Sequence, residues 1–333
     1  MKVTHLFRKP VEFFSIERVF GQLQPELARH LSLQRWTAPY SGVSFLKMVK
    51  NICSARGQIT DIYHITGDIH YLAAGLPRKR TILTIHDCVF LYRNKGIKRL
   101  LLKWLFLDIP AWRCALVTTI SEATRKDIIN NTRIDPEKII VIPNPVNERI
   151  KYVPRSFSHS EPIILFIGTT PNKNLERVIP ALKSVPCRLD IIGNLTAETI
   201  SLLQENDIVY ENATGLSDDE IADRYTRSDL VLFPSTFEGF GLPIVEAQKA
   251  GRPVITSDLE PMRGVAGGAA CLVDPYSIPA IRDAVQRVSS DQKYRDELVA
   301  AGLENVKRFS VSRISQQYIA CYNKVFEKYS FKQ

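Results

Sequence analysis

Short apolar stretches recur along the chain, and each is followed by a longer segment in which apolar residues have helical spacing. The stretches are residues 2–7, 61–65, 81–85, 116–120 and 138–142, then 162–167, 188–192, 230–233 and 253–256. They end in polar or turn residues, as strands do. Continuous apolar runs are typical of parallel strands that are buried on both faces. The alternation therefore predicts α/β domains with parallel sheets.

The length and one polar segment predict two domains. A chain of 333 residues is longer than one hydrophobic core usually serves. Lys151 to Pro162 separates the two sets of strands, and its polar, proline-containing sequence without a period indicates a linker. Helical spacing over residues 311–331 predicts a terminal helix. We expect one domain at residues 1–152, a second at 153–312, and a helix at 313–333 that packs back on the first domain.

Positive charge is concentrated in the first half. Residues 1–150 have 23 basic and 12 acidic side chains, a net charge of +11, whereas residues 151–333 have 21 and 23, a net charge of −2. The first half is therefore expected to meet an anionic membrane, a phosphate-bearing acceptor or a nucleic acid. Tyr92 to Arg113, where cations alternate with leucines, predicts either a membrane-surface helix or an amphipathic helix packed on the sheet. Nucleic acid is disfavoured because no binding motif is present.

The cysteines and the apolar segments bear on location. None of the six cysteines lies within four residues of another, so no zinc or redox spacing exists, and scattered thiols fit a reducing cytosol. The start of the chain lacks the long apolar stretch of a signal peptide. Leu100 to Trp112 is too short and too charged to span a bilayer. We expect a cytoplasmic protein, with peripheral attachment to the membrane left open.

Ligands of parallel sheets bind beyond the carboxyl ends of the strands, which directs attention to residues 233–251, FPSTFEGFGLPIVEAQKAG. Pro243 suits the first turn of a helix that ends at Gly251. The N–H groups of Phe240, Gly241 and Leu242 would point out of the helix start, and glycine would let a ligand approach. The segment predicts a phosphate site.

Charged side chains accompany this segment. Glu238 in the loop and Glu246 one turn into the helix are hydrogen-bond acceptors that suit a sugar hydroxyl and a ribose diol. The alternatives are a solvated loop acid and an acid that complements the helix dipole. Lys173 follows another strand, in the turn that starts at Gly168, where it could hold a diphosphate as a point charge. The alternative is an ordinary surface lysine.

These segments together resemble the retaining GT-B glycosyltransferases of family 4, also called glycosyltransferase group 1. The resemblance also involves Asn174, Tyr225, and residues 119–122, 142–146, 216–218 and 267–275. It implies an α/β fold of two Rossmann-like, doubly wound domains facing a central cleft. It implies transfer of a hexosyl unit from a nucleoside-diphosphate sugar to a hydroxyl of a glycan or polyprenyl-linked acceptor, with retention, in bacterial surface polysaccharide or lipopolysaccharide synthesis. No cofactor and no metal is implied, and GDP-mannose and UDP-hexose donors both remain open.

The resemblance also implies roles for individual residues. Glu238 would contact the donor sugar, His86 would lie near the transferred sugar, and Lys173 would bind the pyrophosphate. Glu246 would hold the ribose. The remaining residues of the donor site would be Gly168, Thr169, Gly239, Phe240, Gly241 and Leu242. On the acceptor side the candidates are Asp87, Ser15 and Glu17.

Three departures from the family pattern bear on function. Thr169 stands where the family usually has an arginine, and Arg263 is a candidate replacement. The segment around Ser15 lacks the two glycines that often precede Glu17 in the family. Gly264 stands where an acid is common. A sugar-nucleotide epimerase of the same architecture and an inactive GT-B binding protein therefore remain alternatives, the second favoured by Thr169.

Overall fold

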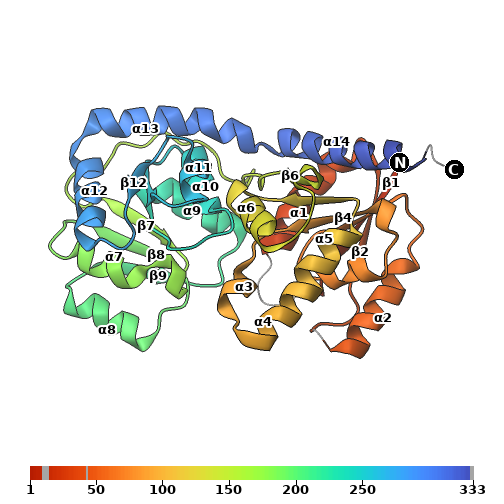
Figure 1. Cartoon of the computed structure of the whole chain (residues 1–333). Helices are drawn as coiled ribbons and strands as arrows, with labels where there is room; N and C mark the ends of the chain where they lie inside the picture. Colours follow the sequence, from red (N-terminus) through yellow and green to blue (C-terminus); the bar gives the residue numbers. More distant parts are fainter. Residues whose placement is uncertain (10–14, 43, 331–333) are drawn as a thin grey trace. The chain divides into compact units, whose positions relative to one another are not determined.

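The computed structural model describes residues 1–9, 15–42 and 44–330, apart from the side chains of Ser15, Arg93 and Ser330. The chain divides into two compact units, here called unit 1 (Met1–Pro145 and Val311–Gln333) and unit 2 (Val146–Ser310). Each unit has one six-stranded parallel sheet with helices on both faces, so the predicted pair of Rossmann-like domains is confirmed (Figure 1). The division falls after Pro145 and Ser310, whereas the sequence-based boundaries follow residues 152 and 312.

The sheet of unit 1 has the strand order β2-β1-β3-β4-β5-β6, and every neighbouring pair is parallel. Its strands are β1 (Lys2–Phe7), β2 (Ser32–Thr37), β3 (Ile62–Ile65), β4 (Thr81–Ile85), β5 (Leu116–Thr119) and β6 (Ile139–Val141). Its helices are α1 (Ser15–Ala28), α2 (Phe45–Arg56), η1 (His70–Ala74), η2 (Arg78–Arg80), α3 (Val89–Arg93), α4 (Gly96–Lys103), the π-helical turn η3 (Trp104–Asp108), α5 (Ile109–Arg113), α6 (Glu122–Asn131), η4 (Pro136–Lys138) and α14 (Val311–Ser330).

The two faces of this sheet differ in chemistry. Successive residues of a strand point to opposite faces. Leu83 and Ile85 of β4, with Ile65 of β3, belong to an apolar core that also includes residues of α2, η1 and α6. The intervening residues His64 and Thr84 belong to a polar row on the other face, which α1 and α14 cover. One face of the sheet therefore packs on an apolar core, and the other face has a buried, hydrogen-bonded row of polar side chains.

Helix α14 is fixed to the polar row by buried hydrogen bonds. The Tyr322 hydroxyl lies 2.9 Å from His5 Nε2 and 2.7 Å from His64 Nδ1. His64 Nε2 lies 2.8 Å from Thr84 Oγ1, which lies 2.7 Å from Thr118 Oγ1. A hydroxyl both donates and accepts, so each of these groups finds a partner in the row. The final helix is thus part of unit 1.

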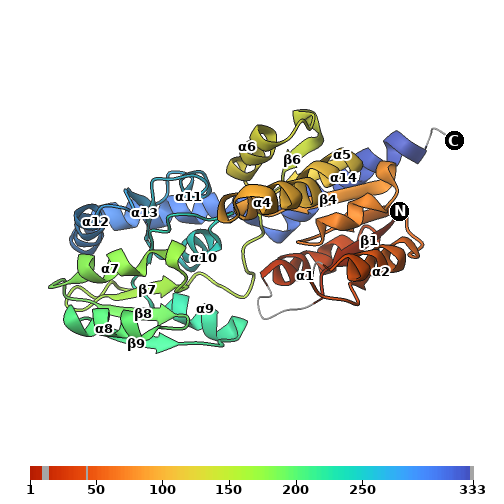
Figure 2. The same ribbon diagram turned by 60° about the horizontal axis from the view of Figure 1, so that its bottom comes forward.

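The sheet of unit 2 has the strand order β12-β11-β10-β7-β8-β9, also parallel throughout, and Figure 2 shows β7, β8 and β9 side by side. Its strands are β7 (Ile163–Ile167), β8 (Arg188–Ile192), β9 (Val209–Ala213), β10 (Leu230–Phe233), β11 (Val254–Ser257) and β12 (Cys271–Val273). Its helices are η5 (Pro171–Lys173), α7 (Leu175–Leu182), α8 (Ala197–Glu205), α9 (Asp218–Arg227), α10 (Leu242–Ala250), α11 (Met262–Ala266), α12 (Ile278–Ser290), α13 (Gln292–Asn305) and η6 (Val306–Phe309).

The sequence explains where these helices begin and end. Ser217 and Glu220 form a reciprocal capping box at the start of α9. Pro243 lies in the first turn of α10, and Gly251 ends that helix in the left-handed conformation, as expected. Pro180 lies within α7, which is only eight residues long. The capping, proline and glycine signals therefore agree with the helix bounds seen in the structure.

Three strands were missed by the sequence analysis: β2, β9 and β12. All three lie at sheet edges. β2 and β9 are mostly exposed or half-buried, so their sequences, SLQRWT and VYENA, mix polar and apolar residues. β12 has only three residues. Because an edge strand needs no continuous apolar run, the pattern that revealed the central strands could not reveal these.

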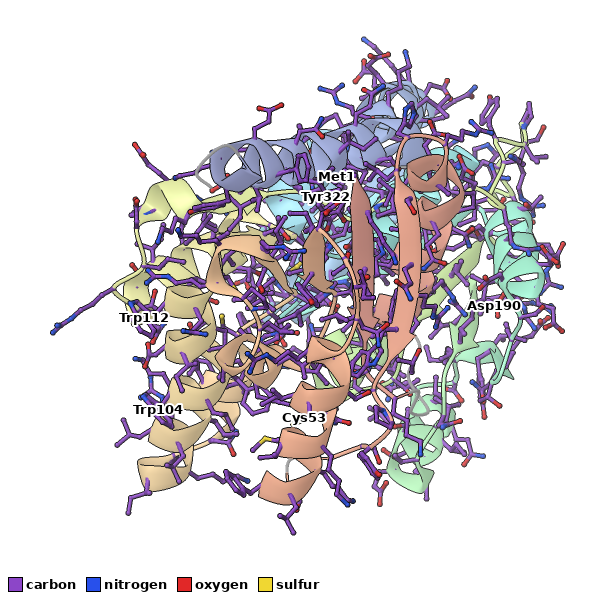
Figure 3. The ribbon with its side chains drawn as sticks, turned by 90° about the vertical axis from the view of Figure 1, so that its right-hand side faces the viewer. Met1, Cys53, Trp104, Trp112, Asp190 and Tyr322 are labelled. Carbon is purple, nitrogen blue, oxygen red and sulfur yellow. The ribbon has the colours of Figure 1, made fainter. Side chains whose placement is uncertain are left out.

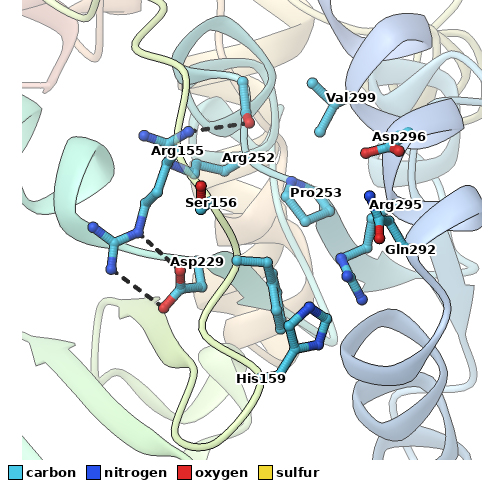
Figure 4. A pocket seen from close by; sticks show the side chains of 12 residues that line it. Arg155, Ser156, His159, Asp229, Arg252, Pro253, Gln292, Arg295, Asp296 and Val299 are labelled. Carbon is cyan, nitrogen blue, oxygen red and sulfur yellow. Dashed lines mark hydrogen bonds and ion pairs between the residues drawn. The ribbon is translucent and has the colours of Figure 1, made fainter.

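The predicted linker, residues 151–162, has no helix or strand and is held against unit 2. Arg155 donates to the fully buried carboxylate of Asp229 at 2.8 Å. Arg252 donates to the carbonyls of Tyr225 and Thr226, at the end of α9. These side chains line a cavity of about 460 Å³ where β10 and β11 begin (Figure 4). The segment is thus an ordered part of unit 2.

Candidate functional site

The strand order of unit 2 places a topological switch point between β7 and β10. From β7 the chain proceeds to β8 and β9 on one side, and from β10 to β11 and β12 on the other. Connections that leave in opposite directions open a crevice at the carboxyl ends of the two central strands. The turn after β7 contains Lys173, and the loop after β10 contains Glu238. The two segments that the sequence analysis singled out therefore meet at this crevice.

An ion pair joins these two segments. Lys173 Nζ lies 2.6 Å from Glu238 Oε1, and the two side chains are 18% and 14% exposed. The same ammonium lies 4.6 Å from the centre of the Phe233 ring, a cation–π contact. The pair is reachable from solvent but is largely shielded from it. An anionic ligand at this point would compete with Glu238 for the lysine.

The turn after β7 is shaped to hold Lys173 in place. Gly168 has φ of +89°, and a Cβ atom there would lie 2.9 Å from Lys173 Cε, so the lysine crosses directly over this glycine. Asn174 is fully buried in the left-handed conformation and donates to the carbonyls of Pro234 and Pro275. One amide thus ties the turn to the loops after β10 and β12.

Backbone donors are available at the start of α10. Gly241 precedes the helix with φ of +103°, a conformation that favours glycine. Within the described part of the chain, the N–H groups of Phe240, Gly241 and Leu242 have no protein acceptor. Phe240 itself is buried against the Phe309 ring, and Gly239 lies in the loop between Glu238 and Phe240. The structure thus presents the expected anion-binding helix start.

Glu246 lies beyond the first turn of α10 and accepts a hydrogen bond of 2.8 Å from the hydroxyl of Tyr225. The Tyr225 side chain is fully buried, and burial together with the charge of Glu246 raises the tyrosine pKa well above its usual value. The tyrosine therefore stays a hydrogen-bond donor. It fixes one carboxylate oxygen of Glu246.

The structure shows what surrounds Thr169, which departs from the family pattern, and Arg263, its candidate replacement. Thr169 donates to the carbonyl of Asn194 at 2.7 Å and packs against Gly193, so its side chain links the turns after β7 and β8. Arg263 Nε donates to the carboxylate of Asp258 and Nη2 donates to its backbone carbonyl, and the carboxylate raises the arginine pKa. The candidate replacement for the family's arginine is therefore already paired with an acid.

In unit 1 the switch point lies between β1 and β3. Arg8 follows β1 and donates to Glu17 of α1 at 2.9 Å and to Asp68, which follows β3, at 2.6 Å. Glu17, a candidate on the acceptor side, is therefore engaged by an arginine. The other candidate in this helix, Ser15, has a side chain outside the described residues.

His86 and Asp87 follow β4 but do not form a His–Asp pair. His86 Nε2 lies 2.8 Å from the carbonyl oxygen of Thr66, an acceptor, so this nitrogen carries the proton and Nδ1 keeps a lone pair in the neutral ring. Asp87 accepts from the N–H of Val89 at the start of α3. No hydrogen bond joins the two side chains in the part of the chain that the structure describes.

Two residues of these crevices were missed by the sequence analysis. Asn172 donates to the carbonyl of Phe237 and to Glu238, and its own carbonyl accepts from Thr236. It joins the two loops beside the ion pair. Arg8 is the centre of the cluster in unit 1. Arg8 directly follows β1 and Asn172 lies in the turn after β7, so the strand-end rule applied to polar residues of every type would have selected them.

Residues 1–9, 15–42 and 44–330 contain no group of three histidine, cysteine or acidic side chains arranged to hold a metal ion. Over the same ranges, no helix has the length and apolar character needed to cross a bilayer.

Two family models match the chain. Residues 150–304 match the model described as Glycosyl transferases group 1, and residues 23–149 match the model described as Glycosyltransferase Family 4. The two matches meet at the end of the first predicted domain and together cover the strands from β2 to β12. Both models describe glycosyltransferases, which disfavours the alternative that the chain is a sugar-nucleotide epimerase.

Individual proteins agree with these matches. O-antigen chain mannosyltransferase B of Escherichia coli is 27% identical over 289 residues, which cover 78% of this chain and 74% of the relative. The MMP alpha-(1->4)-mannosyltransferase of Mycolicibacterium hassiacum is 25% identical over 355 residues, covering 97% and 84%. The structure of Anabaena HepE in complex with UDP and glucose has a TM-score of 0.77 at 17% identity, covering 96% and 99%, and so shares the fold. The chain therefore belongs to the group 1 glycosyltransferases, family 4, with the GT-B fold.

Proposed function

We propose that this glycosyltransferase moves a hexosyl unit from a nucleoside-diphosphate sugar to a hydroxyl of a glycan or polyprenyl-linked acceptor, with retention of the anomeric configuration. We assign the donor to the crevice between β7 and β10 of unit 2. The acceptor side is assigned to the strand ends of unit 1. The observation that carries the proposal is the Lys173–Glu238 pair beside the open N–H groups at the start of α10.

The leaving diphosphate explains why these groups are together. Cleavage of the bond between the sugar and the diphosphate leaves negative charge on phosphate oxygens. Donors that are already oriented stabilise such charge without reorganising, usually the largest single contribution to catalysis. Lys173 supplies a full positive charge and the helix start supplies oriented N–H groups. The donor thus replaces Glu238 at Lys173, and the released carboxylate becomes available to a sugar hydroxyl.

The other residues have roles that follow from their partners. Glu246, fixed by Tyr225, accepts from the ribose diol. His86 retains a lone pair on Nδ1, which can accept a proton or a hydroxyl hydrogen bond on the acceptor side. Because Lys173 and backbone N–H groups already provide the positive potential, we propose that the reaction needs no metal ion or cofactor.

The relatives suggest which substrates to test first. Two of them are named mannosyltransferases, and one of these acts on O-antigen chains. The HepE structure contains UDP and glucose. We therefore propose GDP-mannose and UDP-glucose as the first donors to compare, and bacterial surface polysaccharide or lipopolysaccharide as the pathway, on the cytoplasmic face of the membrane.

The first experiment measures binding by thermal shift. A ligand that binds only the folded protein raises the melting temperature, and a concentration 100 times the Kd stabilises by about 2.7 kcal/mol. GDP-mannose, UDP-glucose and free mannose would be compared without added metal and with EDTA. A shift by one sugar nucleotide in EDTA is expected. A shift that appears only after a divalent cation is added would contradict the metal-free assignment.

The second experiment measures transfer of labelled sugar to lipid-linked acceptors in bacterial membrane extracts. Lys173→Met and Glu246→Gln should each lower kcat/KM by at least about 100-fold, since each removes a charged contact to the donor. Lys293→Met is a matched control, because it removes an exposed lysine, paired with Glu297 at 4.0 Å, from the same unit. Donor binding without any transfer would instead favour the inactive binding protein.

A further inference from the structure

Large apolar side chains are exposed on two helical stretches of unit 1. In α2, Phe45 and Leu46 are 73% and 70% exposed. In α4 and the turn that follows it, Ile97, Leu101 and Trp104 are 76%, 62% and 59% exposed. Leu100, Trp112 and Val49 are exposed as well. We call these eight residues the apolar surface. The alternative of an amphipathic helix packed on the sheet, with residues 100–102 and 104–107 as core, holds for Leu105, Phe106 and Leu107, which belong to or pack against the apolar core. It is wrong for the exposed Leu100, Leu101 and Trp104.

The two stretches belong to one layer of unit 1. Helix α2 packs against η1, and so do η3 and α5. Figure 3 shows Trp104 and Trp112 on one helical stretch and Cys53 on neighbouring α2. The inner side of the longer stretch is already used, because Leu107, Pro110 and Ala111 are buried. The apolar surface therefore lies on the outer side, where a helix that only packs on its own sheet would have polar residues.

Positive charge predominates in this layer. Residues 27–60 and residues 88–107 each contain five lysines or arginines and no acidic residue. The next acid, Asp108, is paired with Lys103 at 2.8 Å. The guanidinium of Arg78 lies 4.9 Å from the centre of the Trp112 ring. Positive charge thus predominates around the apolar surface, and Asp108 within the longer stretch offsets the charge of Lys103.

A cavity continues this charge beyond Trp112. It has a volume of about 630 Å³ and lies beside the start of β6, and its lining includes the cations Lys103, Arg133 and Lys138 and the acids Asp108 and Asp135. The neighbouring amides of Asn130 and Asn131 also line it. Space next to an apolar surface, with cations around it, suits an anionic headgroup whose chains lie on the apolar side.

The combination identifies the occupant. Apolar side chains surrounded by lysine and arginine match the boundary of an anionic bilayer, where the former enter the acyl region and the latter meet phosphates. Tryptophan favours this boundary because its ring is amphipathic. A second copy of the chain would bring two positively charged faces together, which is unfavourable. We propose that α2 and the stretch α4–η3–α5 dock unit 1 onto an anionic lipid bilayer.

The test is co-sedimentation of the full chain with vesicles. Vesicles of equal parts phosphatidylglycerol and phosphatidylethanolamine should bind it, and vesicles of phosphatidylcholine alone should bind it at least about tenfold more weakly. Binding should weaken as salt is added. The emission of Trp104 and Trp112 should shift to shorter wavelength on binding, whereas buried Trp36 should not change. Equal binding to both vesicles, or no binding to either, would overturn the proposal.

Variants separate the two features of the surface. The triple variant Leu100→Ser, Leu101→Ser, Trp104→Ser should lose most binding, and Lys98→Gln with Arg99→Gln should weaken binding roughly 25-fold, about fivefold per charge. Ile59→Ser is the matched control, because Ile59 is 84% exposed in unit 1 but lies outside both helices. All these positions are exposed, so folding should persist. If the wild-type chain ignores vesicles but dimerises and the triple variant stays monomeric, the surface is a protein interface instead.

This inference does not depend on the donor chemistry. Vesicle binding requires no sugar nucleotide, and donor binding in unit 2 requires no lipid. The triple serine variant should retain its thermal shift with the donor. Failure of one proposal therefore leaves the other intact.

Discussion

Replacing Tyr322 by phenylalanine should destabilise unit 1 while leaving unit 2 unaffected. The hydroxyl bridges His5 Nε2 and His64 Nδ1 in a fully buried row. Its removal leaves one buried nitrogen on each ring without this partner. An unsatisfied buried polar group costs about 1–3 kcal/mol, so two of them should lower the free energy of unfolding of unit 1 by about 2–6 kcal/mol.

Tryptophan fluorescence during urea unfolding measures this effect for one unit. All three tryptophans, Trp36, Trp104 and Trp112, belong to unit 1, and Trp36 is buried. Their signal therefore follows unit 1 even if the two units unfold in separate transitions. The midpoint should fall with little change in slope.

Tyr329→Phe provides the matched control, because it is the same substitution in the same helix. Among the described residues, the Tyr329 hydroxyl has no hydrogen-bond partner, and its ring contacts Lys79 and Lys328. This variant should change stability by less than about 0.5 kcal/mol. A loss below about 0.5 kcal/mol in Tyr322→Phe, or equal losses in both variants, would refute the reasoning that the buried row fixes α14.

Three other predictions concern acid, positioning and backbone shape. Burial lowers the pKa of His5 to about 3 and lowers the pKa values of His64 and His70 below 6.5, so the unfolded chain binds more protons than the folded chain as the pH falls below 6.5. The free energy of unfolding should then drop by up to about 1.4 kcal/mol per pH unit for each histidine. Urea midpoints that stay level from pH 7 to pH 4 would contradict this. Tyr225→Phe releases one oxygen of Glu246 and should raise the donor KM about tenfold with little change in kcat, whereas a loss confined to kcat would speak against a positioning role. Gly168→Ala brings a Cβ within 2.9 Å of Lys173 Cε and should abolish the thermal shift with donor. Gly215→Ala is the control: it carries similar backbone strain, since Gly215 has φ of +67°, but it has open space around it and should retain the shift.

The central strands could be predicted from the sequence because strands buried on both faces consist of continuous apolar residues. β1, β4, β8 and β10 have the bounds that the apolar runs indicate. The edge strands β2 and β9 have no such apolar run, since water covers part of them. The order of the strands also explains why Lys173 and Glu238, 65 residues apart, form an ion pair. Only the general rule about strand ends was available from the sequence.

The contact partners of the candidate site residues were harder to predict than the positions of those residues in the fold. The resemblance implied Glu17 and Asp87 as acceptor-side residues, yet Arg8 donates to Glu17 and the N–H of Val89 donates to Asp87. The Thr169 side chain lies against Gly193. Such pairings depend on side chains from distant segments, which a single sequence does not bring together.

The return of α14 to unit 1 has a consequence for the order in which the protein is made. All residues of unit 2 are synthesised before α14. His5 and His64 of unit 1, in contrast, form their hydrogen bonds with Tyr322, which is synthesised more than 300 residues after His5. Domains generally fold as units during synthesis, so the second one should mature first. A released chain that ends at residue 310 should therefore contain a protease-resistant unit 2 and a protease-sensitive N-terminal half. Equal protease resistance of both would show that the N-terminal strands fold without α14.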